Sequence, residues 1–235
     1  MVILLLVFSF FIASAEPPTA SEILERTIQY HDPQGQWASG AIYLKIRSES
    51  PKGDSNIREA WINIPAEKFE MKATKNASQS LRGMLKDSCY YALNGETDLA
   101  EDSIQKYRLD CARTLMFRDY LTYLNGLPMK LKDPGTILDP KVEKTSYMNE
   151  DVWVLTVRYN PEVGDEIYQF YIKPNNYAMI GYRFYRDETQ PKGEYIVLKE
   201  ETMVGQMRIP KIREWYTFPD TSFLGADILE EGRIE

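Results

Sequence analysis

The sequence predicts a mainly β protein of the α+β class: an antiparallel half-barrel of about ten strands, with an N-terminal and a central helix covering its concave face. Three observations predict this fold. Many short segments alternate apolar and polar residues, as half-buried strands do. Turn signals at short spacing separate these segments, among them Asn94-Gly95 and Pro174-Asn175-Asn176. Only a few stretches show helical spacing, so the helices are expected to cover a sheet that curls on itself.

The first residues are typical of a secretory signal. Met1 to Phe11 is an almost unbroken apolar run, and the small residues Ala13-Ser14-Ala15 follow it. A membrane span needs roughly 20 apolar residues, so this run is short for one, although an uncleaved N-terminal anchor is the alternative. We therefore expect a signal peptide over residues 1–15, export, one domain over residues 16–235, and no transmembrane segment after cleavage.

The first helix is expected from Thr19 to Tyr30. Thr19 and Glu22 have the spacing of a capping box, and apolar residues then recur at helical spacing. Pro33 ends the pattern, because a proline disfavours helical geometry in the residue before it. An amphipathic helix in this place should pack against the sheet.

The rest of the chain alternates between strand and helix patterns. Ile42, Leu44 and Ile46 form one apolar face of a strand that follows Trp37. A weak helical pattern over Leu99 to Tyr107 and a stronger one over Cys111 to Asn125 come next, and Met129 to Pro140 reads as a loop. Further strands are expected at Glu59–Ile64, Phe69–Ala73, Ser88–Leu93, Lys141–Tyr147, Val152–Tyr159, Glu166–Lys173, Ala178–Tyr185, Gly193–Gly205, Met207–Phe218 and Phe223–Glu230.

The charge of the chain argues against two classes of partner. The formal net charge is −7 and the sequence pI is about 5.0. Nucleic acids favour clustered Lys and Arg, so no nucleic-acid partner is expected. The excess of acidic over basic residues also disfavours electrostatic binding to anionic lipid surfaces.

The two cysteines, Cys89 and Cys111, allow two interpretations. An exported protein keeps disulfides, and a bridge here would close a loop of about 22 residues, worth about 3 kcal/mol. Alternatively, both are buried thiols that act as small apolar residues.

The sequence contains no recognisable catalytic motif. With His31 as its single histidine, it has no set of His ligands for zinc, and it lacks the nucleophile elbow, the Walker A loop and the dinucleotide-binding turn. We predict no catalytic residues, no metal and no cofactor, and a function that is not enzymatic. The alternative is a hydrolase that uses His31 with nearby carboxylates.

Aromatic residues are the most distinctive excess, with 16 Tyr, 9 Phe and 4 Trp. They indicate either cross-strand packing in a β core or an apolar cavity with polar tips. For such a cavity the candidate ligand-binding residues are His31, Trp61, Phe69, Met116, Tyr120, Tyr123, Lys130, Phe170, Arg183 and Phe184.

Three segments, Tyr30 to Trp37, Leu127 to Thr136 and Gly181 to Tyr185, resemble an uncharacterised family of exported bacterial proteins. That family is similar to the periplasmic lipoprotein carriers of the Lol system. The resemblance runs from the first helix to the segment Phe223 to Leu229. It implies a half-barrel with helices over its mouth, a cavity for acyl chains, and a periplasmic or cell-envelope protein that binds a lipid or an acylated protein. A structural envelope protein with a filled core is the remaining alternative.

Overall fold

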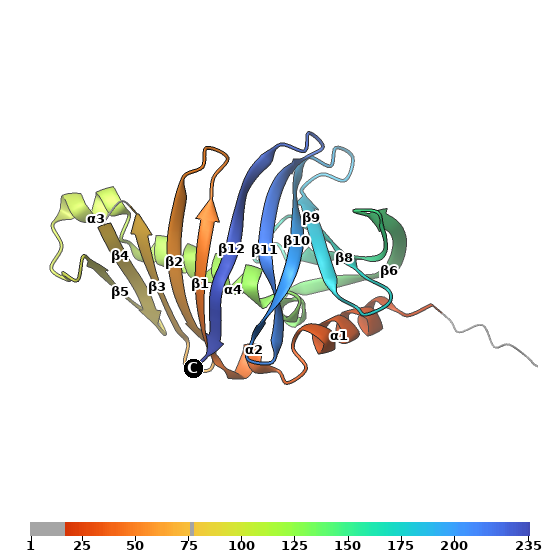
Figure 1. Cartoon of the computed structure of the whole chain (residues 1–235), viewed down its shortest axis with the longest axis horizontal. Helices are drawn as coiled ribbons and strands as arrows, with labels where there is room; N and C mark the ends of the chain where they lie inside the picture. The colour runs from red at the N-terminus through yellow and green to blue at the C-terminus, as the bar shows by residue number, and fades with distance from the viewer. Residues whose placement is uncertain (1–16, 76–77) are drawn as a thin grey trace, which may run out of the picture.

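The computed structural model describes residues 17–75 and 78–235, which form one twelve-stranded antiparallel sheet with helices packed against it (Figure 1). The predicted signal peptide, residues 1–15, lies outside the described residues. The helices are α1 (Ala20–His31), α2 (Gln36–Ser39), α3 (Glu101–Tyr107), α4 (Cys111–Gly126) and the 3-10 helix η1 (Met129–Lys132). The strands are β1 (Ala41–Glu49), β2 (Ser55–Asn63), β3 (Lys68–Lys75), β4 (Ser78–Leu85), β5 (Ser88–Leu93), β6 (Thr136–Tyr147), β7 (Glu150–Tyr159), β8 (Ile167–Ile172), β9 (Met179–Tyr185), β10 (Gly193–Val204), β11 (Met207–Phe218) and β12 (Phe223–Ile234).

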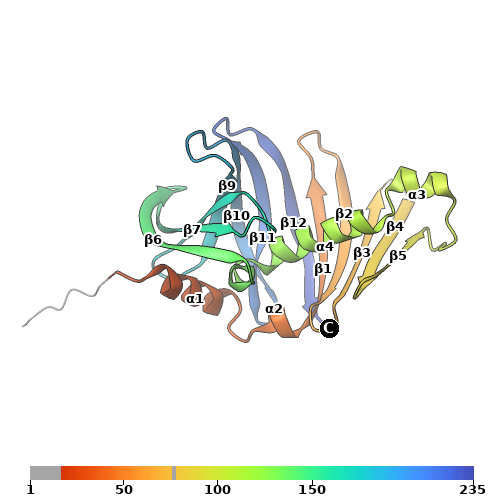
Figure 2. The same cartoon turned by 180° about the vertical axis from the view of Figure 1, so that it is seen from behind.

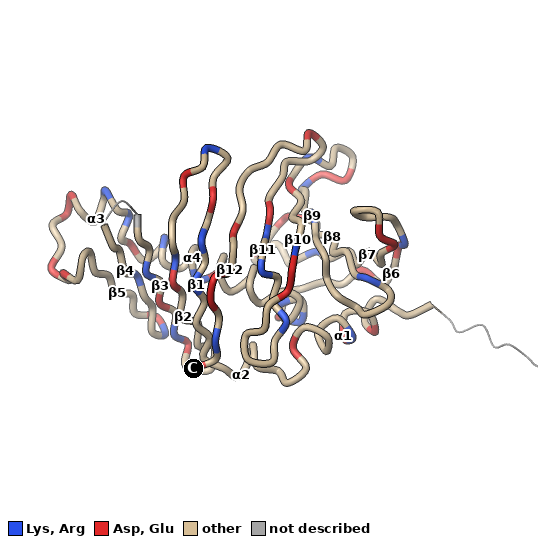
Figure 3. Tube along the Cα trace, in the orientation of Figure 1, with Lys and Arg blue, Asp and Glu red and all other residues tan. Residues whose placement is uncertain are grey.

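The strand order makes the sheet a meander whose first and last strands meet in its middle. It runs β5-β4-β3-β2-β1-β12-β11-β10-β9-β8-β7-β6. β1 pairs with β12 from Ile42 opposite Ile234 to Glu49 opposite Ala226. The edges are therefore β5 and β6, and the predicted antiparallel, mainly β class is confirmed. Acidic and basic residues are interspersed along the strands (Figure 3).

The predicted number of about ten strands was too low. β4 was missed because its sequence contains Gly83 and mixes polar with apolar residues on both faces. A Cβ on Gly83 would lie 2.4 Å or less from ring atoms of Tyr90 on β5, so the glycine makes room for a cross-strand aromatic ring. In addition, β6 begins at Thr136, inside the segment that was predicted to be a loop.

The helix α1 forms for the predicted reason. Thr19 is its N-cap and accepts from the amide N–H of Glu22, whose carboxylate accepts from the amide N–H of Thr19. The helix ends at His31, as Pro33 requires. It lies across one end of the sheet, beside β6 and β11, and packs Ile23 and Leu24 into the core.

The longest helix, α4, crosses one face of the sheet, from the side of β4 and β5 towards the side of β6 to β8 (Figure 2). We call this face the inner face and the opposite one the outer face. Asp110 caps α4 by accepting from the amide N–H of Arg113. The helix carries five buried residues: Thr114, Leu121, Leu124, Asn125 and Gly126.

Two apolar clusters hold α4 to the inner face. Leu124 belongs to a cluster with α1 and β7 to β10, and Leu121 belongs to one with β1 to β3, β11 and β12. Between them, the buried guanidinium of Arg213 on β11 donates to the backbone carbonyl of Leu124 over 3.2 Å. Burial lowers the pKa of Arg213. The centre of the inner face is thus filled, and the hollows lie to either side of α4.

Candidate functional site

A hollow of about 460 Å³ lies on the inner face, between the C-terminal half of α4, η1 and the strands β6 to β8. Its volume falls in the range of about 300–1,000 Å³ that is usual for small-molecule sites. We call it the aromatic hollow. Its lining residues are Asp119, Thr122, Tyr123, Lys130, Asp133, Pro134, Thr136, Tyr159, Glu162, Val163, Gly164, Glu166 and Tyr168.

Three tyrosines from three elements form its apolar wall. The ring of Tyr123 on α4 lies 5.8 Å from that of Tyr168 on β8 and 6.3 Å from that of Tyr159 on β7. Tyr159 and Tyr168 meet edge to face at 5.6 Å. The strand register explains this meeting, because Val157 pairs with Tyr168 and brings the next inward residue, Tyr159, alongside. Such edge-to-face contacts are favourable for aromatic rings.

The hydroxyl groups in the wall are held in their neutral form. Burial raises the pKa of Tyr159 to about 12, and it raises the pKa values of Tyr123 and Tyr168 as well. The hydroxyl oxygens of Tyr123 and Tyr159 lie 2.6 Å apart and share a hydrogen bond. The wall therefore presents uncharged ring surface, and the hydroxyls of Tyr123 and Tyr159 already bond to each other.

Two turns and one ion pair make the rim. Lys130 on η1 pairs with Asp133. Gly135 adopts φ +87°, and a Cβ there would lie 2.8 Å from Cγ2 of Val163 in the opposite turn. The amide N–H of Asn160 donates to the carbonyl of Gly135 over 2.9 Å, which joins the two turns. The rim thus combines one charged pair with closely packed backbone.

Four predicted ligand-binding residues lie in or directly behind this hollow. Tyr123 and Lys130 line it. The ring of Tyr168 stacks on Phe184 at 5.1 Å and on Phe170 at 5.9 Å. Phe170 is fully buried, so it supports the wall from behind.

Three further predicted residues lie elsewhere on the inner side. Phe69 is buried in the cluster of β1 to β3. Met116 and Tyr120 on α4 are 40% and 39% exposed. The pKa of Tyr120 is raised by the desolvation of its hydroxyl, and Asp227 raises it further. Tyr120 is therefore a second aromatic surface on the inner side, outside the lining of the aromatic hollow.

The structure places Trp61, Arg183 and His31 away from the aromatic hollow. Trp61 lies on the outer face, because its neighbours Ala60 and Ile62 point inward; its ring packs against Tyr43 at 5.0 Å. Arg183 also lies on the outer face and donates to Oε1 of Gln169 over 2.6 Å.

His31 is buried, with 1% of its surface exposed, and both of its ring nitrogens are occupied. Nδ1 lies 2.7 Å from the carbonyl oxygen of Arg208, and Nε2 accepts from the amide N–H of Met179 over 3.0 Å. The ring is therefore the neutral Nδ1–H tautomer, and burial lowers its pKa. His31, one of the predicted ligand-binding residues, therefore lies inside the core and away from the aromatic hollow, because the end of α1 turns inward.

Two wall residues, Tyr159 and Tyr168, were absent from the predicted ligand-binding set. Strand alternation carries the signal that would have found them. Val157 and Tyr159 share a face with the fully buried Leu155, and Tyr168 shares one with Phe170. Which of the two faces meets α4 becomes known only from the three-dimensional arrangement.

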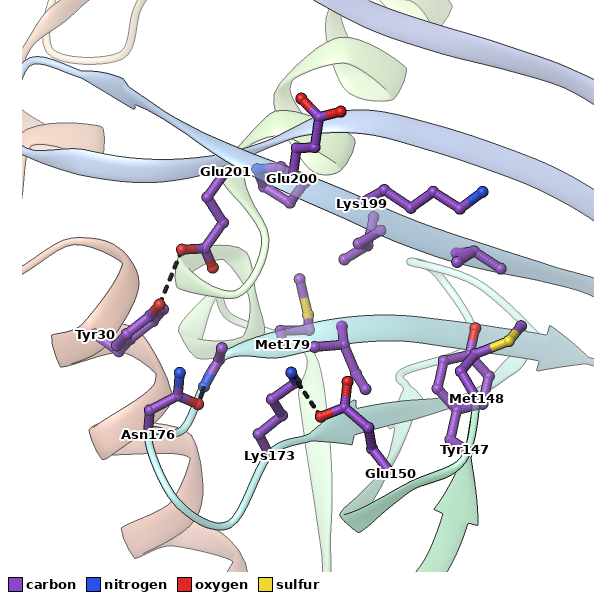
Figure 4. Close-up of a pocket in the computed structure, with 15 residues that line it drawn as sticks. Tyr30, Tyr147, Met148, Glu150, Lys173, Asn176, Met179, Lys199, Glu200 and Glu201 are labelled. Atoms are coloured by element: carbon purple, nitrogen blue, oxygen red, sulfur yellow. Dashed lines mark hydrogen bonds and ion pairs between the residues drawn. The ribbon is translucent and has the colours of Figure 1, made fainter.

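A second hollow, of about 480 Å³, opens on the opposite side of the sheet (Figure 4). Its charged groups are already paired: Nζ of Lys173 lies 2.6 Å from Oε2 of Glu150, and the hydroxyl of Tyr30 donates to Glu201 over 2.9 Å. Tyr147 is one of its lining residues and stacks on Tyr171 at 4.1 Å. None of the predicted ligand-binding residues lines it, so we regard the aromatic hollow as the candidate site.

No helix within residues 17–75 and 78–235 is both long enough and apolar enough to cross a bilayer. Among curated proteins, no significant match to this sequence was found. A family model described as "Family of unknown function (DUF6503)" matches residues 1–232.

Several solved structures share the fold. A LolA superfamily protein from Nitrosomonas europaea is 12% identical, with a TM-score of 0.56 over 93% of this chain and 94% of that chain. A domain assigned to outer membrane lipoprotein sorting, from Vibrio parahaemolyticus, is 8% identical, with a TM-score of 0.54 over 92% and 93%. A DUF1329 family protein from Desulfovibrio piger is 6% identical, with a TM-score of 0.53 over 92% of each chain. The resemblance to the lipoprotein-carrier superfamily is confirmed at the level of the fold.

Proposed function

The chain belongs to DUF6503, a family of unknown function, and on that premise we propose that it is an exported envelope protein that binds a hydrophobic ligand, a lipid or an acylated protein. The ligand's apolar part would occupy the aromatic hollow beside α4. Residues 1–15 would be removed as a signal peptide, and residues 16–235 would form the half-barrel domain, with α4 over its concave face. The function is binding without catalysis.

The observation that carries the proposal is the wall of Tyr123, Tyr159 and Tyr168 around a hollow of about 460 Å³. When an apolar guest covers an uncharged ring face, the complex is stabilised by about 25 cal/mol for each Å² of apolar surface removed from water. The hydroxyls of Tyr123 and Tyr159 are hydrogen-bonded to each other, so an apolar guest would leave that hydrogen bond intact. The lipoprotein-carrier fold supports the same class of ligand by analogy of fold.

The two alternatives fit the geometry less well. A hydrolase built on His31 needs a free ring nitrogen, and both nitrogens are bonded inside the core. A structural protein with a filled core accounts for the two apolar clusters. It does not account for the aromatic wall around a hollow beside them.

Binding of a fluorescent fatty acid to the mature protein tests the proposal. We expect saturable binding, weakened about tenfold or more by Tyr168→Ala, because this change removes the ring shared by the whole wall. Val163→Trp should also weaken binding by filling the hollow from its exposed rim.

Trp61→Ala is the matched control, since it removes a comparable aromatic ring from the outer face. Its affinity should stay within about twofold of the unaltered protein. Circular dichroism should confirm that all three variants are folded. Absence of saturable binding, or equal losses in Tyr168→Ala and Trp61→Ala, would rule the proposal out.

A further inference from the structure

A third hollow, of about 520 Å³, lies beside the N-terminal half of α4, between that helix, α3 and the strands β2 to β4. We call it the basic pocket, because five of its residues carry a positive charge. The positively charged residues of its lining are Arg58, Arg82, Lys106, Arg108 and Arg113. The same helix thus borders an aromatic hollow near its C-terminus and a basic pocket near its N-terminus.

Three guanidinium groups gather around one aromatic ring. The Cζ atoms of Arg82 and Arg113 lie 5.0 Å from the ring centroid of Phe117, and that of Arg58 lies 5.9 Å from it. They come from β2, β4 and α4. Cation–π contact with Phe117 holds each of them, but it does not neutralise their charges. Three cations so close together repel one another unless an anion lies between them.

Arg82 is the key residue of the pocket, because only 5% of its surface is exposed. Its terminal nitrogens donate to the carbonyls of Arg108 and Tyr107, over 3.2 and 3.4 Å. Its Nε is buried and has no partner among the described residues. A buried guanidinium usually has a carboxylate or phosphate partner, and an unpaired donor is costly.

Local acids do not balance this charge. Among the described residues, neither Arg82 nor Arg113 forms an ion pair. Arg58 lies 3.9 Å from Asp227. Asp110 uses its carboxylate on the amide N–H of Arg113 at the start of α4. Five cations therefore face two acids, in a chain whose net charge is −7.

We propose that the basic pocket binds an oxyanion, a phosphate or carboxylate group, between Arg58, Arg82 and Arg113. Guanidinium groups bind such anions through paired, charge-assisted hydrogen bonds. Within the described part of the chain, the buried Oδ1 of Asn56 also has no partner, and a flip of the side-chain amide would offer its N–H₂ group to the same anion. This site goes beyond the proposed function, since it stands on its own geometry.

The disulfide of Cys89 and Cys111 supports the pocket. It joins β5 to the first residue of α4, with the two Cα atoms 5.7 Å apart. Arg113 follows two residues after Cys111, and Arg82 pairs with Tyr91 on β5. The bridge therefore holds the helical arginine in place beside the strand arginine.

Isothermal titration of the mature protein with inorganic phosphate, oleoyl lysophosphatidate and uncharged mono-oleoylglycerol tests the proposal. We expect phosphate or lysophosphatidate to bind, and Arg82→Gln and Arg113→Gln each to weaken that binding about tenfold or more. Arg118→Gln, which removes the same charge from the same helix outside the basic pocket, should change affinity less than twofold. Binding of phosphate itself points to a free anion, whereas binding of lysophosphatidate alone points to a lipid headgroup.

The outcomes separate the two proposals. Failure of both anionic probes to bind, or binding unaltered in both arginine variants, overturns the oxyanion site. Failure of mono-oleoylglycerol and of the fluorescent fatty acid, with phosphate still bound, overturns the proposed function and leaves the oxyanion site intact. Should Arg82→Gln fail to fold, Arg113→Gln decides, since Arg113 is only half-buried.

Discussion

The amide N–H of Met179 on β9 donates to Nε2 of His31, at the end of α1, over 3.0 Å. The other ring nitrogen of His31 lies 2.7 Å from the carbonyl oxygen of Arg208 on β11. One neutral imidazole therefore fastens the end of α1 to two strands of the sheet. A protonated ring would lose the bond from Met179, because Nε2 would then carry a hydrogen and could not accept one.

We expect the protein to lose stability as the pH falls below about 6.5, the usual pKa of histidine. Burial lowers the pKa of His31 in the folded state, so the unfolded chain binds a proton first. Titration of His31 therefore leaves the free energy of unfolding unchanged above about pH 6.5, and lowers it as the pH decreases further. One proton gives a slope of at most about 1.4 kcal/mol for each pH unit. Urea unfolding between pH 8 and pH 5 measures it.

The variant His31→Gln is the control for this prediction. It removes the only histidine of the chain, so the part of the pH dependence between about 7 and 5 should flatten, although the variant is less stable throughout. An equally steep decline in His31→Gln would assign it to carboxylates instead.

Much of the fold could be predicted from local patterns. The capping box of Thr19 and Glu22 fixed the start of α1, and alternation found most strands, because both signals depend only on near neighbours. β4 was missed because Gly83 in it reads as a breaker. Its role, making room for Tyr90, depends on the strand beside it.

The candidate site was predictable only in part. Aromatic excess pointed to a cavity, and Tyr123 and Lys130 do line one. Trp61 alternates on its strand as regularly as Tyr168 does, but it lies on the opposite face from α4. The sequence carries only a weak signal for the basic pocket. Arg58 lies on the same strand face as Ala60 and Ile62, and a charged residue is unexpected on that apolar face.

The two faces can be told apart by stability measurements. Phe170→Ala should lower the free energy of unfolding by about 3–5 kcal/mol, because its ring is fully buried behind the aromatic hollow. Trp61→Ala should cost clearly less, since its half-buried ring leaves no enclosed cavity. Urea unfolding of both variants measures the difference. Equal losses would contradict the assignment of Trp61 to the outer face.

The rim of the aromatic hollow depends on one glycine. Gly135→Ala should destabilise the protein by about 1–2 kcal/mol, because φ there is +87° and the new Cβ would lie 2.8 Å from Val163. Gly164→Ala, in the opposite turn, is the matched control. A Cβ there would meet its nearest neighbour, Glu166, at an ordinary 3.6 Å, so stability should change by less than about 1 kcal/mol. Thermal unfolding of the two variants compares them, and equal effects would argue against a special role for Gly135.

The bridge between Cys89 and Cys111 gives the last prediction. The sequence left open whether these residues were bridged or free, and the structure joins them. Thiol titration of the denatured, exported protein should therefore find no reactive sulfur. The double variant Cys89→Ser with Cys111→Ser should lower stability by about 3 kcal/mol, the loop-closure value for a separation of 22 residues. For a chain of this size, that corresponds to a melting temperature lower by roughly 6–12 °C.

The same double variant separates stabilisation of the whole fold from support of the basic pocket. If the bridge positions Arg113 beside Arg82, phosphate or lysophosphatidate should bind more weakly to the variant at a temperature where it is fully folded. Uncharged mono-oleoylglycerol should bind unchanged, because it offers no oxyanion to the basic pocket and the aromatic hollow lies at the other end of α4. Parallel losses for both probes would mean that the variant is globally loosened. Two reactive thiols in the exported protein would contradict the bridge itself.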